Sequence, residues 1–176
     1  MSDAFGKGGK GWPKRSTGAP SWRPQRRLAL MAVGRYGTLD GPCGTNGLTP
    51  CVGLIVRMRA TTAPYFVAHI SCGVAVPSKD DANYEIVRID VRDRLRRLLL
   101  HAPARGHVHI ATGNPREHSA HAIIKGILDW TGFEVQPLSQ DSIVIDEGGA
   151  LSTAGNHPLN EHGIGPFQTP LPARRF

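Results

Sequence analysis

Two β-branched and aromatic runs, separated by a short connection, constrain the fold of this 176-residue chain more than any other feature. Residues 52–58 (VGLIVRM) and 65–70 (YFVAHI) have the composition of strands, and residues 59–64 (RATTAP) between them contain a proline and small side chains. Two such runs with a turn-forming segment between them are typical of an antiparallel hairpin. The sequence therefore predicts a hairpin centred near residue 60.

A symmetric hairpin would bring a cysteine and a histidine together. In that register Cys51 lies opposite His69, where facing Cβ atoms are about 4.5–5.5 Å apart. A slip of one residue would turn the two side chains to opposite faces of the sheet. A cysteine nucleophile needs a base, and the base needs a third group to hold its ring. Thr45, six residues before Cys51, is the candidate for that third group.

These residues resemble a known family of enzymes. Residues 45–52 (TNGLTPCV) followed by residues 68–70 (AHI) look like the catalytic core of the bacterial chemoreceptor glutamine deamidases, the CheD family. The same cysteine–histidine arrangement occurs in the deamidase domains of cytotoxic necrotizing factor toxins. The resemblance extends to about residue 153. It implies a Cys51, His69 and Thr45 triad, a protein substrate bearing a target glutamine, no cofactor, and a β-sandwich-like core flanked by two or three helices.

The chain departs from that family at the residue before the cysteine. The family usually has a serine there, whereas this chain has Pro50, which has no N–H to donate. An oxyanion hole must then use other donors, and we expect the backbone N–H of Cys51 or Val52 to serve. A cysteine protease or a transglutaminase-type acyl transferase would use the same cysteine and histidine, so these two activities are alternatives.

The three cysteines also allow simpler roles. Cys51 could be an inert buried thiol, or it could form a disulfide with Cys43 in an oxidising compartment. The third cysteine, Cys72, leaves an odd number and weakens a disulfide framework. If His69 is the partner of Cys51, its imidazolium should hold the thiol pKa below the free value of about 8.5. Cys51 should then be alkylated before Cys72.

Four other histidines suggest a competing metal site. His107 and His109 alternate on a predicted strand, and His118 and His121 share one face of a predicted helix. Imidazole binds zinc, copper or nickel, but the chain contains no HExxH motif and no carboxylate at a recognised spacing from these histidines. We therefore expect no metal.

The positive charge is concentrated in the first 27 residues. They contain seven Lys or Arg and one Asp, which accounts for +6 of the net charge of +7. Their Gly, Pro and Ser content predicts a disordered basic tail, with a catalytic domain at residues 28–153 and a Pro/Gly-rich extension at 154–176. A non-enzymatic module that binds through this tail is the alternative from another class. Nucleic-acid binding by Trp12 and Trp22 is a weaker possibility, so we do not expect nucleic acid as a partner.

The hydropathy pattern predicts no membrane span, because no apolar run approaches 18 residues. The first residues also lack the apolar region of a secretory signal. We expect action in a cytoplasm, either that of the producing cell or that of a target cell reached by export without a cleavable signal. The second route would fit a bacterial effector or toxin.

The remaining patterns predict an α+β, or mixed α/β, domain. Helices are expected from an N-cap at Asp90 to about residue 101, and from Asn114 and Pro115 to about residue 130, where Gly132 ends the helix. A loop is expected over residues 37–49. The further strands are expected at residues 28–33, 107–111, 133–136 and 142–146.

Overall fold

The computed structural model describes residues 29–37, 41–59, 64–101 and 103–153, and for 29–37 only the course of the backbone. The predicted tail at 1–27 and the extension at 154–176 lie outside the described residues. The elements are β1 (Ala29–Gly37), β2 (Cys43–Asn46), β3 (Val52–Arg57), β4 (Tyr65–Cys72), α1 (Ala82–Leu98), β5 (Val108–Thr112), α2 (His118–Thr131), β6 (Leu138–Ser139), β7 (Ser142–Ile145) and β8 (Leu151–Ser152).

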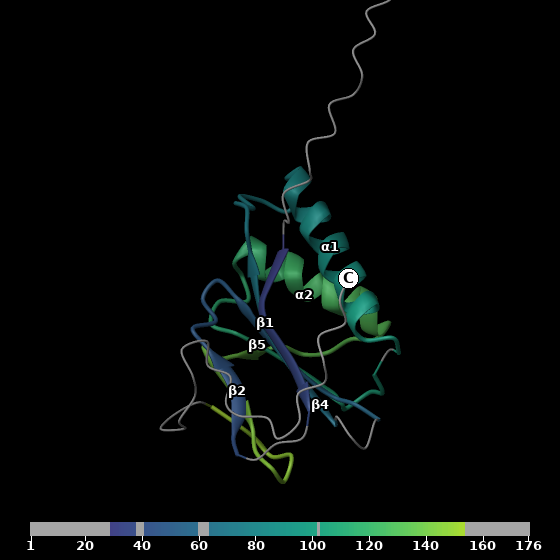
Figure 1. The fold of residues 1–176 in the computed structure, drawn as a ribbon. Coiled ribbons are helices and arrows are strands. Elements are labelled where there is room, and N and C mark those ends of the chain that lie inside the picture. Colours follow the sequence, from purple (N-terminus) through teal and green to yellow (C-terminus); the bar gives the residue numbers. More distant parts are fainter. Residues whose placement is uncertain (1–28, 38–40, 60–63, 102, 154–176) are drawn as a thin grey trace, which may run out of the picture.

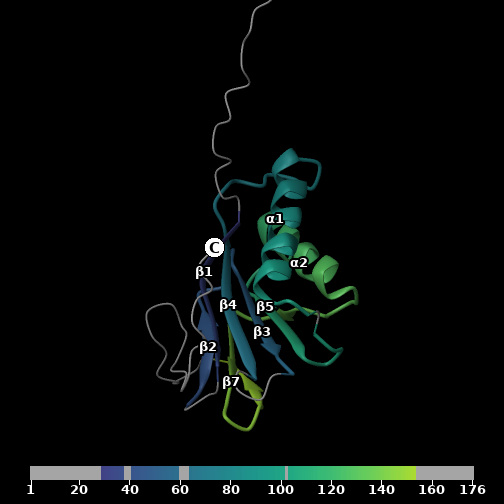
Figure 2. The ribbon, with the colours of Figure 1, turned by 45° about the vertical axis from the view of Figure 1, so that its right-hand side comes forward.

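The strands form two sheets, and the fold is α+β as predicted. The larger sheet has the order β1-β4-β3-β5-β6 and the smaller one has the order β2-β7-β8. All strand pairs are antiparallel except β5–β6. Both helices lie on one side of the larger sheet (Figure 1), and β2 and β7 lie on its other side (Figure 2). The larger sheet is therefore the middle of three layers. Neither described helix has the length and apolar character that crossing a membrane requires.

The central hairpin is buried on both faces, which explains its nearly continuous apolar sequence. Side chains at even positions, such as Leu54 and Phe66, join the core beneath the two helices. Side chains at odd positions, such as Ile55 and Val67, join a second core that includes Ile143 of β7. The two sheets thus share an apolar interface, as the expected β-sandwich-like core requires.

The hairpin register differs from the predicted one by two residues. Gly53, and not Cys51, lies opposite His69. The reason is the closing pair of the turn, in which the Met58 N–H donates to Pro64 O at 2.5 Å, so the hairpin is centred on residue 61. The prediction that Cys51 faces His69 directly was wrong. A shift of two residues nevertheless preserves the face to which each side chain points.

Helix α1 begins earlier than the sequence predicted. Its N-cap is Asp81, whose carboxylate accepts a hydrogen bond from Asn83 N at 2.8 Å, and not Asp90. The extra first turns bury Tyr84 and Val87 beneath the helix. Burial of these side chains therefore stabilises helical turns that a cap at Asp90 would have left out.

The start of helix α2, in contrast, was predicted too early. Its N-cap is Glu117, which accepts from the N–H groups of Ser119 and Ala120, and Asn114 instead accepts from Arg116 N in a local turn. The predicted end is confirmed, because Gly132 follows the helix in the left-handed conformation, with φ of 75°.

One strand prediction and one loop prediction were wrong. Residues 133–136 form no strand, and the pairing with β5 is made by β6, after Pro137. The predicted loop at 37–49 contains β2, which is held by its pairing with β7. Both differences depend on partners far along the chain.

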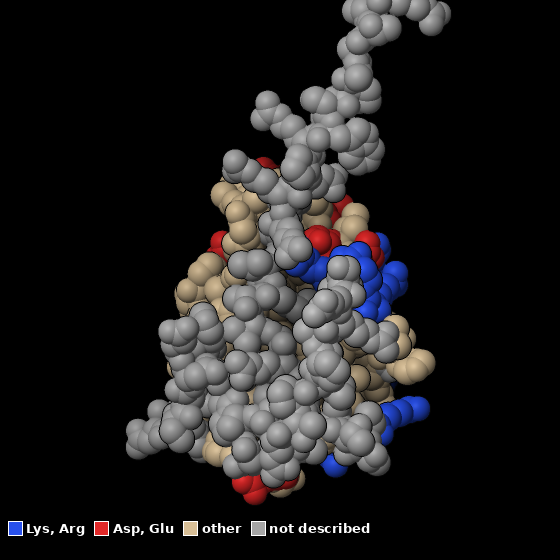
Figure 3. Space-filling view, viewed as in Figure 1, with Lys and Arg blue, Asp and Glu red and all other residues tan. Residues whose placement is uncertain are grey.

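The arginines of α1 lie on its exposed face, and acidic side chains lie among them (Figure 3). The ion pairs are Arg88–Glu85, Arg88–Asp129, Arg92–Asp93 and Arg94–Asp90. This segment is the charged face of an amphipathic helix.

Candidate functional site

The first predicted site residue, Thr45, lies on β2 and not in a loop. It pairs with Ile143 of β7, and its side chain is fully buried against the larger sheet. A threonine hydroxyl in an apolar core needs a hydrogen-bond partner, since leaving it unpaired would cost about 1–3 kcal/mol. That partner comes from β4.

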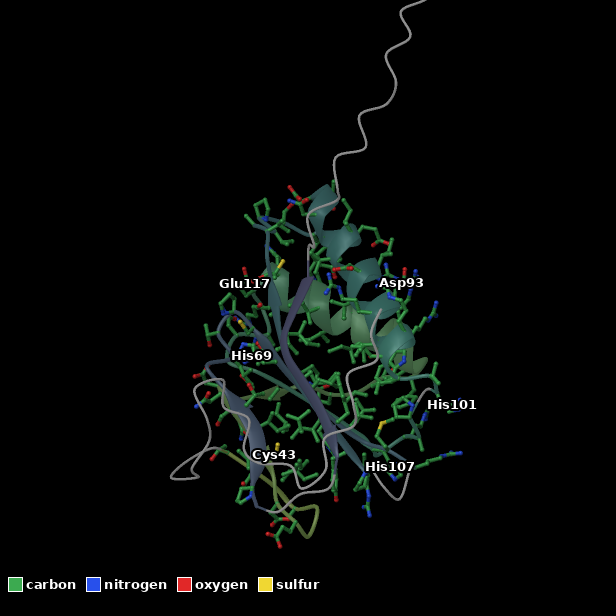
Figure 4. The ribbon with its side chains drawn as sticks, viewed as in Figure 1. Cys43, His69, Asp93, His101, His107 and Glu117 are labelled. Carbon is green, nitrogen blue, oxygen red and sulfur yellow. The ribbon has the colours of Figure 1, made fainter. Side chains whose placement is uncertain are left out.

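The partner of Thr45 is His69. The Thr45 Oγ1 and His69 Nδ1 atoms are 2.7 Å apart. Figure 4 shows His69 beside β2, the strand that is labelled in Figure 1. If Nδ1 carries the proton and donates to Thr45 Oγ1, the other ring nitrogen, Nε2, is left unprotonated. His69 can then act as a base.

Gly53 provides the space in which these two side chains meet. It lies opposite His69 on β3. A Cβ atom added at Gly53 would lie 2.8 Å from Thr45 Cγ2, 2.9 Å from Ile143 Cγ2 and 2.9 Å from Leu48 Cδ1. Such distances are too short for any side chain to fit without moving its neighbours. Glycine at this position therefore lets Thr45 reach across to the histidine.

Cys51 immediately precedes β3 and points toward the same layer as Thr45 and His69. It is half-buried and packs against the core that the two sheets share. Because Gly53 lies opposite His69, Cys51 is a diagonal neighbour of the histidine. Diagonal positions are about 7–8 Å apart, within the reach of long side chains. The structure thus joins Thr45 to His69 directly and places Cys51 on their face of the sheet.

The backbone N–H groups of Cys51 and Val52, the two expected oxyanion donors, differ in where they lie relative to the β3–β4 ladder. Antiparallel pairs alternate between hydrogen-bonded and non-hydrogen-bonded ones. Met58 and Pro64 are a pair of the hydrogen-bonded type, in which the Met58 N–H donates to Pro64 O. Every second pair along β3 and β4 is of the same type, and Val52 with Ile70 is one of them. The Val52 N–H is therefore directed into the β3–β4 ladder. The Cys51 N–H lies outside that ladder.

The segment before Cys51 is anchored to two distant parts of the chain. Leu48 O accepts from Gly113 N at 3.0 Å and from Thr112 Oγ1 at 3.2 Å, at the end of β5. Thr49 Oγ1 donates to Asp141 Oδ1 at 3.0 Å, just before β7. Sequence reasoning missed Asp141, whose only local signal is a carboxylate directly before a strand.

The surroundings of Cys51 raise the pKa of its thiol above the ordinary value. Burial is the largest cause, and the Asp141 carboxylate and the Cys72 thiol add to it. The expectation of a low pKa is therefore contradicted. The physical reason is that partial removal from water and a neighbouring negative charge both disfavour the thiolate.

We expect Cys51 to be alkylated more slowly than a free cysteine at neutral pH. A raised pKa leaves less thiolate, which is the reactive form. The measurement is the rate of iodoacetamide labelling against pH, followed at the Cys51 peptide by mass spectrometry and compared with N-acetylcysteine amide, whose thiol has no neighbouring carboxylate. The midpoint should lie at higher pH for Cys51. A midpoint below that of N-acetylcysteine amide would mean that an ion pair with His69 dominates in the resting protein.

The disulfide alternative is not supported, because Cys43, Cys51 and Cys72 form no disulfide with one another. Cys43 is fully buried in the core between the sheets. Cys72 donates its S–H to Val74 O at 3.1 Å.

The four histidines of the metal alternative do not converge. In Figure 4, His107 lies on the opposite side of the molecule from Glu117, the residue before the helical pair. His118 Nδ1 lies 2.9 Å from a backbone carbonyl oxygen, and His121 Nδ1 lies 2.5 Å from Tyr84 Oη. Among the described residues, no group of three or more His, Cys, Asp or Glu is arranged to hold a metal ion.

Comparison of the chain with protein-family models, with curated proteins and with solved structures finds no match. The functional argument therefore depends on the geometry of the site.

Proposed function

We propose that this protein is a protein glutamine deamidase that uses Cys51 as nucleophile, His69 as base and Thr45 to orient the base. The observation that carries the proposal is the 2.7 Å contact between Thr45 and His69 on the sheet face that also bears Cys51. A histidine held through Nδ1 by a buried hydroxyl, on the sheet face that also carries a half-buried thiol, supplies an orienting group, a base and a nucleophile.

In the first half of the reaction, Cys51 Sγ attacks the side-chain carbonyl carbon of a substrate glutamine. The thiol proton passes to His69 Nε2, and the carbonyl oxygen becomes an oxyanion that the Cys51 N–H stabilises. The C–N bond then breaks, and the proton on His69 leaves with the nitrogen as ammonia. A thioester between Cys51 and the substrate remains.

In the second half, water attacks the thioester carbon and gives a proton to His69. The C–S bond breaks, and this proton returns to the sulfur. The products are glutamate, ammonia and the starting thiol, so one water is consumed for each amide.

The raised pKa of Cys51 suits this sequence of steps. A thiol that is protonated at rest must lose its proton during the attack, which makes His69 a general base and not merely the partner of a preformed thiolate. The orientation of the ring by Thr45 then affects the rate directly.

Thr45→Val should lower kcat by about 10-fold to 100-fold while the protein stays folded, because loss of a group that orients a ligand or base costs about that much. Valine keeps the shape of threonine but cannot bond to Nδ1, whereas Thr45→Ser keeps the hydroxyl and should retain most of the rate. The measurement is ammonia release together with the circular dichroism spectrum. Equal rates for the valine and serine variants would show that the hydroxyl does not orient His69.

The reaction type is tested by mass spectrometry of bacterial and host-cell extracts treated with the protein or with Cys51→Ser. Deamidation adds about one dalton at a glutamine through the thioester route. Cleaved peptides would replace the proposal with a cysteine protease. Crosslinked glutamine–lysine pairs would replace it with a transglutaminase.

A further inference from the structure

Asp141 occupies a special position relative to the nucleophile. It lies directly before β7, and its Oδ1 accepts a hydrogen bond from the hydroxyl of Thr49, which is two residues before Cys51. Its backbone oxygen also accepts from Leu48 N at 3.3 Å. Backbone and side chain together therefore fix this carboxylate against the segment that presents the thiol.

The neighbouring backbone leaves room for this arrangement. A Cβ atom added at Gly113 would lie 1.9 Å from Thr49 Oγ1 and 2.9 Å from Asp141 Oδ1. The Thr49–Asp141 pair thus sits directly on the glycine. Asp141 is exposed, and among the described residues its only side-chain hydrogen bond is the one from Thr49, so its Oδ2 is available to a ligand.

We propose that the Asp141 carboxylate, held by Thr49, forms a substrate subsite that accepts a hydrogen bond from the side-chain NH₂ of glutamine and excludes carboxylates. This inference rests on the proposed deamidase function and identifies the group that selects its substrate. A primary carboxamide has two N–H donors, whereas a carboxylate has only acceptors. Asp141 therefore binds the substrate and repels the glutamate product.

Asp141 would then have two opposite effects on the reaction. A carboxylate beside Cys51 raises the thiol pKa and so opposes formation of the nucleophile. The same charge attracts the polarised amide and the departing ammonia, which picks up a proton in water. The Asp141 charge also repels the carboxylate of the glutamate product and so speeds its departure, because like charges close together repel. The Asp141 carboxylate and, when it is ionised, the Cys72 thiol are the groups whose negative charge raises the pKa of Cys51.

The test compares iodoacetamide with iodoacetate, a carboxamide and a carboxylate of similar size. The ratio of their rates at Cys51 is divided by the same ratio for N-acetylcysteine amide, an uncharged thiol, which cancels the intrinsic difference between the reagents. In the unmodified protein this normalised ratio should be about threefold to tenfold, the effect of one charge a few ångströms away at a partly exposed site. In Asp141→Asn, which keeps an oxygen for Thr49, the ratio should fall to about one.

Two controls separate the effect of the Asp141 charge from the effect of the protein's other charges. Glu147→Gln removes an exposed carboxylate beyond the other end of β7 and should leave the ratio unchanged. Raising the salt to 1 M should lower the ratio, because the Debye length falls from about 10 Å at 0.1 M to about 3 Å.

The outcomes distinguish the subsite from the function. A normalised ratio near one in the unmodified protein, or a ratio that Asp141→Asn leaves unchanged, overturns the subsite. If the ratio behaves as expected but the treated extracts show no deamidated glutamine, the carboxamide subsite stands and the deamidase function fails. If deamidation occurs, Asp141→Asn should also lower kcat/KM by about 10-fold, the usual loss of a hydrogen bond to a charged group.

Discussion

Cys51→Ser and His69→Ala should each lower the rate of glutamine deamidation by about 10⁴-fold to 10⁶-fold, the loss seen when a member of a catalytic unit is removed. Serine cannot replace the thiol, because its hydroxyl is far more weakly acidic than a cysteine and is a poorer nucleophile. Alanine at residue 69 leaves the Cys51 proton without an acceptor. The double variant should be hardly slower than either single one, because both residues serve the same step. Ammonia release and the mass of the substrate peptide measure these rates.

Two matched variants make this result specific. Cys72→Ser changes the neighbouring thiol and should keep most of the activity, since a serine hydroxyl can also donate to the Val74 carbonyl oxygen. Deletion of residues 1–27 should also leave the chemistry intact on a peptide substrate. If the deletion abolishes function while Cys51→Ser retains it, the protein is a binding module that uses its basic tail. Losses that add in the double variant would show that Cys51 and His69 act in separate steps.

Gly44→Ala should destabilise the protein by about 3 kcal/mol or more, at the upper end of the cost of overpacking. A Cβ atom at this position would lie 2.1 Å from Ile143 O and 2.6 Å from Val144 Cα, which are backbone atoms of β7. Backbone atoms cannot rotate away as the tip of a side chain can. The β2–β7 pair must then separate, and Thr45 moves with β2. Urea unfolding followed by circular dichroism gives the free-energy change.

Gly148→Ala is the control for that substitution. It lies in the connection between β7 and β8, and the one atom near its added Cβ would be Asp146 Oδ1, at 3.3 Å. This side chain can move, so we expect a change within about 0.5 kcal/mol, as for ordinary surface substitutions. Equal effects at residues 44 and 148 would mean that β2 and β7 are not packed as closely as the structure shows.

Local patterns in the sequence were sufficient to locate the two strands of the central hairpin, though not their register, and one helix end. The β-branched runs at residues 52–58 and 65–70 predicted β3 and β4, because a strand that is buried on both faces of its sheet has a nearly continuous apolar sequence. Gly132 marked the end of α2, because glycine adopts a positive φ without the steric cost of a Cβ. The spacing of Thr45, Cys51 and His69 also singled out the residues that the fold places on one side of a sheet.

Helix starts were harder to predict, since several residues near each start can act as a cap. Asp81 and Asp90 are both suitable, and so are Asn114 and Glu117. The choice depends on which turns bury apolar side chains. For α1, burial of Tyr84 and Val87 favours the earlier cap, and this burial is a property of the packed molecule.

The tertiary structure alone decided how the site is assembled. The pairing of Gly44 with Val144 makes Thr45 part of a strand, and the two residues are a hundred positions apart in the chain. The closing pair of the hairpin, and not its symmetry, put Gly53 opposite His69. Asp141 comes to the thiol only through this long-range pairing, and it helps to raise a pKa that the motif was expected to lower. Residue spacing determined which side chains share a face, whereas desolvation and neighbouring charge depend on segments that only the folded chain brings together.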